Sequence, residues 1–215
     1  MNNIKNIIFD LGGVVIDLDR SLAVEALKGL GVADADTLLG EYAQKGPFLL
    51  LESGLMSDAQ FYDAILPSCK EGTTCTQVKE AFERFLVGLP VERLATLRSL
   101  RERGYKVFML SNTNPVMYNS WIDLAFRQEG KMVNDYFDGA VLSYQERTCK
   151  PDAQIFKNLI ARYSLNPGET LLLDDSEANC NAARALGLNA IQITKTGQTS
   201  FSEVCRGLEE EGPAE

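Results

Sequence analysis

Between residues 89 and 193, short apolar runs alternate with amphipathic segments, and this alternation restricts the possible folds more than any other feature of the chain. Each run has the length of a buried strand and follows a segment with helical hydrophobic spacing; the runs lie at 107–110, 137–142, 170–173 and 190–193. Strands that alternate with helices in this way form parallel sheets with helices on both faces. A further apolar run, Ile7-Ile8-Phe9, supplies an earlier buried strand. We therefore expect an α/β protein built on a parallel sheet that helices flank.

Residues 17–88 interrupt this alternation, because they carry helical patterns and no convincing strand. A crossover between parallel strands needs only one helix. We therefore expect 17–88 to form a small helical subdomain inserted after the first strand, and 1–16 together with 89–215 to form the core. The alternative is that these helices simply flank the sheet. The expected helices cover 22–30, 35–44, 47–53, 57–66 and 76–87, with N-caps at Ser57, in a capping box, and at Thr76.

Local patterns give three further expectations for the second half of the chain. A helical pattern covers 115–135 and is interrupted at Gly130, and one face of it carries Met117, Trp121, Leu124 and Ala125. Asp152 is the expected N-cap of the next helix, because Pro151 keeps the preceding residue out of helical geometry. The acidic tail at 209–213 is expected to fray.

Polar side chains occur where the expected strands end. Asp10 directly follows the first strand, Ser111 follows 107–110, and Asp174 and Asp175 follow the strand that begins at Thr170. Lys150 lies in the loop after another strand. The carboxyl ends of parallel strands meet at one edge of the sheet, which is where open α/β sheets bind ligands. We therefore expect these side chains to converge on one crevice.

Each of these residues also has a purely structural explanation when it is considered alone. Asp10 could begin a turn with the glycines that follow it. Ser111 could cap a helix, and Asp174 with Asp175 could cap the next one. Lys150 could be an ordinary solvated lysine. The functional interpretation depends on their joint order, with each residue at the end of its own strand–helix unit.

The residue types at this edge favour phosphoryl chemistry. The chain has no histidine, which excludes Ser-His and Cys-His triads and histidine metal ligands. Asp10 and Asp175 would repel each other unless a cation lay between them, and oxygen ligands favour a hard cation such as Mg²⁺. Lys150 and the Ser111 hydroxyl would then help the cation to hold a phosphoryl group. Asp10 could attack the phosphorus and form an aspartyl-phosphate that water hydrolyses.

Charge and composition limit the partners. A chain of 215 residues can bury a large core, and its formal net charge of -9 makes nucleic acid and anionic membranes poor partners. Its five cysteines match no zinc or redox spacing, and no signal peptide or apolar run long enough to cross a membrane is visible. We expect free thiols and a cytoplasmic protein, and the sequence leaves a monomer and a homodimer both open.

The joint pattern resembles the haloacid dehalogenase-like hydrolase superfamily, and the resemblance covers nearly the whole chain. The four motifs of the superfamily occur in the family's order, as Phe9-Asp10-Leu11-Gly12-Gly13-Val14, Leu110-Ser111-Asn112-Thr113-Asn114, Lys150-Pro151-Asp152, and Leu173-Asp174-Asp175 followed by Asn179. The resemblance implies a Rossmann-like sheet and a helical cap, formed by 17–88, that covers the site and selects the substrate. Closure of such a cap would exclude water.

The resemblance also implies a magnesium site. Asp10 would be both the nucleophile and a ligand of Mg²⁺, and the backbone carbonyl of Gly12 and the carboxylate of Asp175 would be further ligands. Asp174 would orient a water molecule of the ion's coordination sphere. Asn179 would contact these groups without binding the ion itself.

The remaining motif residues would bind the substrate. Ser111 and Lys150 would hold the phosphoryl group, with help from Asn112. The chain departs from the common phosphatase pattern at Gly12, because many phosphatases of this superfamily carry a general acid–base aspartate there. A subgroup with an Asp-Leu-Gly motif resembles the chain closely and includes sugar-phosphate phosphatases.

We therefore expect a magnesium-dependent phosphatase that acts on a small phosphorylated metabolite, such as a sugar phosphate. One alternative is a non-catalytic protein of the same fold that binds phosphate or metal and has a regulatory role. Another is a 2-haloacid dehalogenase, which uses an aspartate nucleophile without a metal. The acidic pair Asp174-Asp175 and the absence of an aromatic residue at Gly12 disfavour the dehalogenase.

Overall fold

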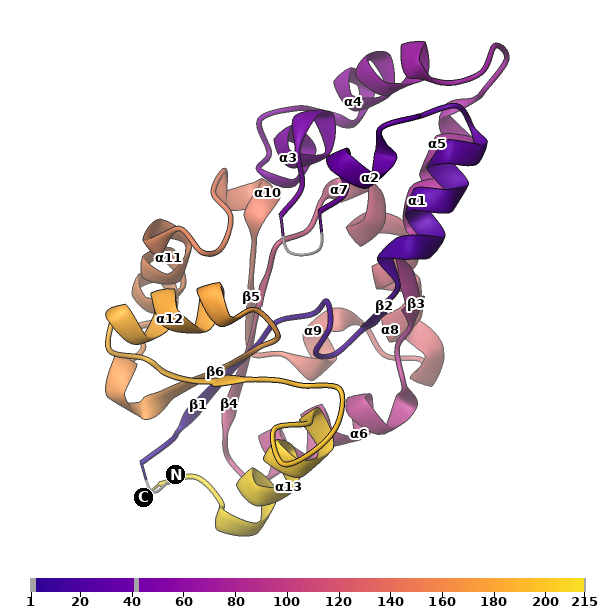
Figure 1. The fold of residues 1–215 in the computed structure, drawn as a ribbon. Coiled ribbons are helices and arrows are strands. Elements are labelled where there is room, and N and C mark those ends of the chain that lie inside the picture. The colour runs from indigo at the N-terminus through magenta and orange to yellow at the C-terminus, as the bar shows by residue number, and fades with distance from the viewer. Residues whose placement is uncertain (1–2, 41–42, 215) are drawn as a thin grey trace.

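The computed structural model describes residues 3–40 and 43–214, and Figure 1 shows how their helices and strands are arranged. At the centre is a five-stranded sheet with the order β5-β4-β1-β6-β7. Its strands are β1 (Asn6–Phe9), β4 (Lys106–Ser111), β5 (Gly139–Leu142), β6 (Thr170–Asp174) and β7 (Asn189–Gln192). Every neighbouring pair runs parallel, which confirms the predicted α/β sheet.

The central position of β1 brings polar residues from different strands to one edge. Phe9 pairs with Met109 of β4 and with Leu173 of β6. Asp10 therefore leaves the sheet at the level at which β6 ends, and Ser111 ends β4 close by. This register makes the edge a single polar surface built from segments far apart in the sequence.

Helices cover both faces of the sheet, because successive side chains along a strand point in opposite directions. On one face, Ile8, Phe108 and Leu172 belong to the cluster that includes α11 (Ala153–Tyr163) and α12 (Glu177–Ala185). The other face packs against α6 (Val91–Glu102), α9 (Val133–Tyr136) and α13 (Phe201–Glu211). Two short elements, α10 (Ser143–Glu146) and η4 (Pro167–Glu169), complete the connections.

The 17–88 segment lies beyond the edge of the sheet at which α10 begins (Figure 1). Its helices are α1 (Arg20–Gly29), α2 (Ala35–Leu38), α3 (Gly46–Glu52), α4 (Asp58–Ile65), η1 (Leu66–Ser68) and α5 (Cys75–Glu83). These helices pack against one another around three buried aromatic rings. The Phe48 ring meets the rings of Phe61 and Phe82 edge-on, at centroid distances of 5.1 and 4.8 Å.

The prediction that 17–88 contains no strand was wrong. A two-stranded antiparallel ribbon joins β2 (Asp17–Leu18) to β3 (Leu86–Gly88), where the segment leaves and re-enters the rest of the chain. Strands of two and three residues are too short to show an alternating pattern, so nothing in the local sequence could reveal them.

The helix boundaries in this segment differ from the prediction in three places. The helix expected over 76–87 ends at Glu83, and Leu86 and Val87 belong to β3 instead. The helix expected over 35–44 ends at Leu38, and residues 41–42 of that range lie outside the described residues. The N-cap of α5 is Thr74 rather than Thr76, because the side chain of Thr74 accepts a hydrogen bond from the N–H of Gln77 and completes a capping box. The capping box predicted at Ser57 is confirmed.

The pattern over 115–135 forms several short pieces rather than one helix. These are α7 (Pro115–Met117), the π-helical η2 (Tyr118–Ile122), α8 (Asp123–Phe126) and η3 (Arg127–Glu129), which end at Gly130. A π-helical turn holds more residues than an α-helical turn, so it rotates the side chains that follow it. Leu124 is consequently 70% exposed and not on the buried face, where the prediction had placed it.

The tail from Glu209 was expected to fray, and this was also wrong. Helix α13 continues to Glu211, because Leu208 is buried in the core and its carbonyl accepts a hydrogen bond from the hydroxyl of Tyr105. Asp152 is the N-cap of α11, as predicted. All five cysteines are free thiols. In the described part of the chain, no helix combines the length and the apolar character needed to cross a membrane.

Candidate active site

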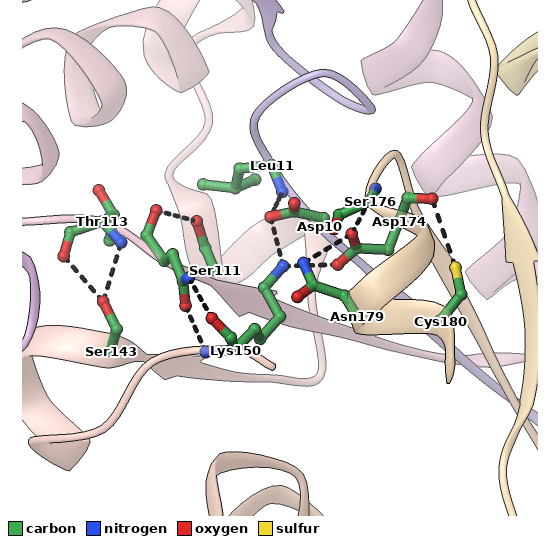
Figure 2. Close-up of polar contacts among 11 residues, drawn as sticks. Asp10, Leu11, Ser111, Thr113, Ser143, Lys150, Asp174, Ser176, Asn179 and Cys180 are labelled. Atoms are coloured by element: carbon green, nitrogen blue, oxygen red, sulfur yellow. Dashed lines mark hydrogen bonds and ion pairs between the residues drawn. The ribbon is translucent and has the colours of Figure 1, made fainter. Parts of the chain in front are cut away.

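The candidate site begins at the turn that follows β1. Asp10 is buried, and its backbone N–H donates to the carbonyl of Leu173 at 2.9 Å. Its side-chain Oδ1 accepts from the N–H of Leu11 at 2.7 Å. The carbonyl of Leu11 accepts from Val15 and Ile16, which folds the chain back on itself. This compact turn fixes the direction of the Asp10 carboxylate (Figure 2).

The turn needs glycine at position 13 for two reasons. Gly13 has φ +73°, a left-handed conformation that other residues adopt only with strain. A Cβ atom there would lie 2.2 Å from Oδ2 of Asp175. The missing side chain therefore leaves the space in which the Asp175 carboxylate lies beside the turn.

Lys150 is buried, with 4% of its surface exposed, which is rare for a lysine that has no charged partner. Its Nζ lies 2.9 Å from Oδ1 of Asp10 and 2.7 Å from Oδ2 of Asp174 (Figure 2). Burial lowers the pKa of this amine, but the two carboxylates outweigh burial and raise its pKa above the ordinary value. Lys150 is therefore a permanent buried ammonium group, and the surface-lysine alternative is wrong.

Asn112 holds the backbone of Lys150 in place. Its Nδ2 donates to the Lys150 carbonyl at 2.9 Å, and its Oδ1 accepts from the Lys150 N–H at 2.8 Å. Ser111 is also buried, and the one acceptor found for its hydroxyl in the described chain is the Asn112 carbonyl, at a long 3.4 Å. Helix α7 is capped by Asn114, not by Ser111. The Ser111 hydroxyl thus remains able to bind a ligand.

The two carboxylates after β6 lie in different surroundings. Asp174 is fully buried, with Oδ1 accepting from the N–H of Ser176 and from Nδ2 of Asn179, both at 2.9 Å, while Oδ2 faces Lys150. Asp174 does not cap the next helix, because the N-cap of α12 is Ser176 and Asp174 binds the N–H of that residue rather than one in the first helical turn. Asp175 is only partly buried, and it lines the same cavity as Asp10.

Three carboxylates converge here, since ligand oxygens of Asp10, Asp174 and Asp175 all lie within 4.8 Å of one another. Burial raises the pKa of Asp10 to about 8; Lys150 opposes this increase, and the charges of Asp174 and Asp175 add to it. One ammonium group cannot balance three carboxylates, so the site attracts a further cation.

A cavity of about 110 Å³ connects these residues with the 17–88 segment. Asp10, Gly12, Ser111, Lys150 and Asp175 line it from the sheet edge. Side chains of the 17–88 segment close the other side, and they include Gln44, Glu52 and Phe82. The residues of the sheet edge were predicted from the sequence, but Glu52 was not, because the sequence around an acid at the end of a helix does not indicate that it lines a site formed by distant residues.

Comparisons with known proteins agree with this geometry. The profile of a family described as haloacid dehalogenase-like hydrolase matches residues 4–187. The chain is 40% identical over 189 residues to the D-ribitol-5-phosphate phosphatase of Bacteroides thetaiotaomicron. This alignment covers 88% of this chain and 91% of the relative. A HAD family enzyme from the same organism, solved with magnesium and inorganic phosphate, is 36% identical with a TM-score of 0.84, covering 91% of this chain and 96% of that one. A HAD-like family hydrolase from Porphyromonas gingivalis is 35% identical with a TM-score of 0.86, covering 95% and 98%.

Proposed function

The chain belongs to the haloacid dehalogenase-like hydrolase family, and on that premise we propose that it is a magnesium-dependent phosphatase that forms an aspartyl-phosphate on Asp10. Its proposed substrate is a phosphorylated polyol or sugar, in keeping with the relative that acts on D-ribitol 5-phosphate. The observation that carries the proposal is the contact of 2.9 Å between Asp10 Oδ1 and Lys150 Nζ at the floor of a cavity lined by Ser111 and Asp175.

The donor set fits a magnesium ion. The ligand atoms near Asp10 are carboxylate oxygens, which hard cations prefer, and the site carries more negative than positive charge. Asp174 uses its oxygens to bind Lys150, Ser176 and Asn179, and Asp175 lines the cavity next to Asp10. Among the described residues, none donates a hydrogen bond to the Gly12 carbonyl. Asp10, the Gly12 carbonyl and Asp175 would therefore hold the ion, which is the ligand set that the family resemblance implies.

When bound, magnesium would offset the charge of the phosphoryl oxygens and of Asp10. The residues of the chain would do the rest. Lys150 and the Ser111 hydroxyl would bind phosphoryl oxygens, which leaves a carboxylate oxygen of Asp10 in line with the phosphorus. Asp10 would form its bond to phosphorus as the alcohol leaves, and a water molecule would then release phosphate from Asp10.

We propose that the 17–88 segment is the cap and that 1–16 and 89–215 form the core. The support is the position of the segment, since Gln44, Glu52 and Phe82 close the cavity opposite Asp10. A cap in this position would exclude water from the aspartyl-phosphate and contact the part of the substrate beyond the phosphate. Substrate selectivity is then a property of this segment.

The test is phosphate release from a panel of polyol, sugar and other small phosphates, with Mg²⁺ and with a chelator. We expect Mg²⁺-dependent release, with polyol or sugar phosphates as the best substrates. Asp10→Asn should abolish turnover, whereas Asp63→Asn, an exposed aspartate of α4, should leave it unchanged.

Three results would contradict the proposal. Turnover that persists in Asp10→Asn would remove Asp10 as the nucleophile. Binding of inorganic phosphate and Mg²⁺ without turnover of any panel member would favour the non-catalytic alternative. Chelator-resistant release of halide from 2-haloacids would instead indicate the dehalogenase.

A further inference from the structure

Resting on the proposed phosphatase function, we propose that Glu52, contributed by α3 of the 17–88 segment, is the acid–base catalytic residue of this enzyme. It would protonate the leaving alcohol in the first step and activate water in the second. The observation behind this proposal is that Glu52 is buried and lines the cavity opposite Asp10, and that none of the residues the structure describes forms a hydrogen bond or ion pair with its carboxyl group.

The reaction needs such a group, because an alkoxide leaves poorly unless it receives a proton. Position 12 cannot supply one in this chain. Gly12 has no side chain, and a Cβ atom there would lie 2.8 Å from Cδ1 of Leu18 in β2. The space beside the turn is therefore filled by an apolar side chain, and the proton donor must come from elsewhere.

Elimination leaves Glu52. Within the described chain, the acidic and basic side chains that line the cavity are Asp10, Glu52, Lys150 and Asp175. Asp10 is the proposed nucleophile, Asp175 is a proposed magnesium ligand, and Lys150 is a permanent ammonium group held between two carboxylates. Among the described residues, no hydrogen bond or ion pair reaches the Glu52 carboxylate.

The backbone of Glu52 is held firmly against the sheet edge. The hydroxyl of Ser143 lies 2.7 Å from the Glu52 carbonyl, and it accepts a hydrogen bond from the N–H of Thr113 at 2.9 Å. Two residues later, Gly54 has φ +63°, and a Cβ atom there would lie 1.9 Å from the Tyr144 carbonyl oxygen. The close approach of this turn to α10 requires glycine, and it places the end of α3 beside α10 (Figure 1), where Glu52 lines the cavity.

The surroundings of Glu52 also suit proton transfer near neutral pH. Burial raises the pKa of this carboxyl from 4.5 to about 7, and the charge of Lys150 opposes the increase. The Cys149 thiol also interacts electrostatically with Glu52, and the carboxylates of Asp10 and Asp175 line the same cavity. The nearby Arg147 donates a hydrogen bond to the carbonyl of Gly54.

The proposed steps balance. In the first, Asp10 forms a bond to phosphorus, the bond from phosphorus to the leaving oxygen breaks, and the Glu52 carboxyl gives its proton to that oxygen. In the second, the Glu52 carboxylate takes a proton from water as the water oxygen attacks phosphorus. The bond from phosphorus to Asp10 breaks and its electron pair returns to the Asp10 carboxylate, while Glu52 keeps the proton that it took from water and is ready for the next cycle.

The test compares kcat/KM of the wild type and Glu52→Gln for phenyl phosphate and 4-nitrophenyl phosphate. These substrates have nearly the same shape and no free hydroxyl group, but 4-nitrophenolate leaves without a proton. kcat/KM reports the first step only. We expect Glu52→Gln to lower it about 10²–10⁴-fold for phenyl phosphate and for D-ribitol 5-phosphate, and to change it little for 4-nitrophenyl phosphate. The loss of activity on raising the pH through about 7 should disappear in the variant.

The outcomes separate this proposal from the phosphatase assignment. If the wild type releases phosphate and Glu52→Gln affects both aryl substrates equally, or neither, Glu52 is not the acid and the assignment stands. If only the polyol phosphate is affected, Glu52 binds substrate hydroxyls instead. If the wild type hydrolyses no phosphate ester at all, both proposals fail. Glu80→Gln, an exposed glutamate of α5, is the matched control and should match the wild type.

Discussion

The ammonium nitrogen of Lys150 lies 2.9 Å from Oδ1 of Asp10, and the same nitrogen lies 2.7 Å from Oδ2 of Asp174. A single buried cation thus holds together the carboxylates that end two neighbouring strands. Lys150 fixes the nucleophile and also offsets part of the negative charge of the site.

Replacing Lys150 by methionine should therefore impair both stability and turnover. The substitution keeps an apolar stem but leaves two buried carboxylates without their partner, which costs about 3–5 kcal/mol of unfolding free energy. Turnover should fall by orders of magnitude. Urea unfolding and phosphate release measure the two effects, and Lys157→Met, an exposed lysine of α11, is the control. A variant with wild-type rate would show that Lys150 lies outside the reaction.

Asn112→Asp should reveal how far the backbone of Lys150 depends on Asn112. The aspartate can still accept from the Lys150 N–H, but it cannot donate to the Lys150 carbonyl. A buried carbonyl that loses its donor costs about 1–3 kcal/mol. We expect reduced stability together with a lower kcat, because Lys150 then loses its fixed position. A lower stability with an unchanged kcat would limit Asn112 to a structural role.

Gly13→Ala should weaken magnesium binding. The added Cβ would lie 2.2 Å from Oδ2 of Asp175 and would displace that carboxylate. The left-handed backbone adds about 1–2 kcal/mol of strain. Gly72→Ala isolates the strain, because Gly72 has φ +82° and nothing within 4 Å of its Cβ position. The Mg²⁺ concentration for half-maximal activity should rise only in Gly13→Ala. If this concentration is the same in both variants, Asp175 is not a magnesium ligand.

Glu52→Gln should increase stability in a pH-dependent way. Burial raises the pKa of Glu52 from 4.5 in the unfolded chain to about 7 in the fold, against the opposing charge of Lys150. Below pH 4.5 the group is protonated in both states and does not affect stability. Between pH 4.5 and about 7 the fold loses stability progressively, and at higher pH the loss of unfolding free energy stays constant at about 3 kcal/mol. Thermal unfolding should show the gain growing across this range, with no such trend in Glu80→Gln. Parallel stability curves for wild type and Glu52→Gln would mean that Glu52 is solvated.

The parallel sheet and its polar edge were predictable from local patterns. The runs that became β1, β4 and β6 are apolar because both faces of a parallel sheet are covered, and that burial is visible residue by residue. The polar edge followed from topology, because parallel strands end on the same side. Asp10, Ser111 and the acidic pair could therefore be assigned to one place without coordinates.

Other features depend on contacts between segments far apart in the sequence. The ribbon of β2 and β3 is too short for its own pattern, and the π-helical turn after Met117 turned Leu124 outward. The local sequence shows the hydrophobic period of a helix or strand, but it does not show where a helix changes its turn and rotates the side chains that follow.

The position of Glu52 is the clearest example of a feature that depends on the tertiary structure and not on the local sequence. Its own sequence neighbourhood predicts only the end of an amphipathic helix. It faces Lys150 because Gly54 lets the turn after α3 approach the backbone of α10, and because Ser143 holds the Glu52 carbonyl. The positions of the sheet-edge residues follow from the common direction of the strands, and the strand–helix alternation in the sequence is enough to predict that direction. The residues that face them from the 17–88 segment are set by close packing of two surfaces, which exists only in the folded chain.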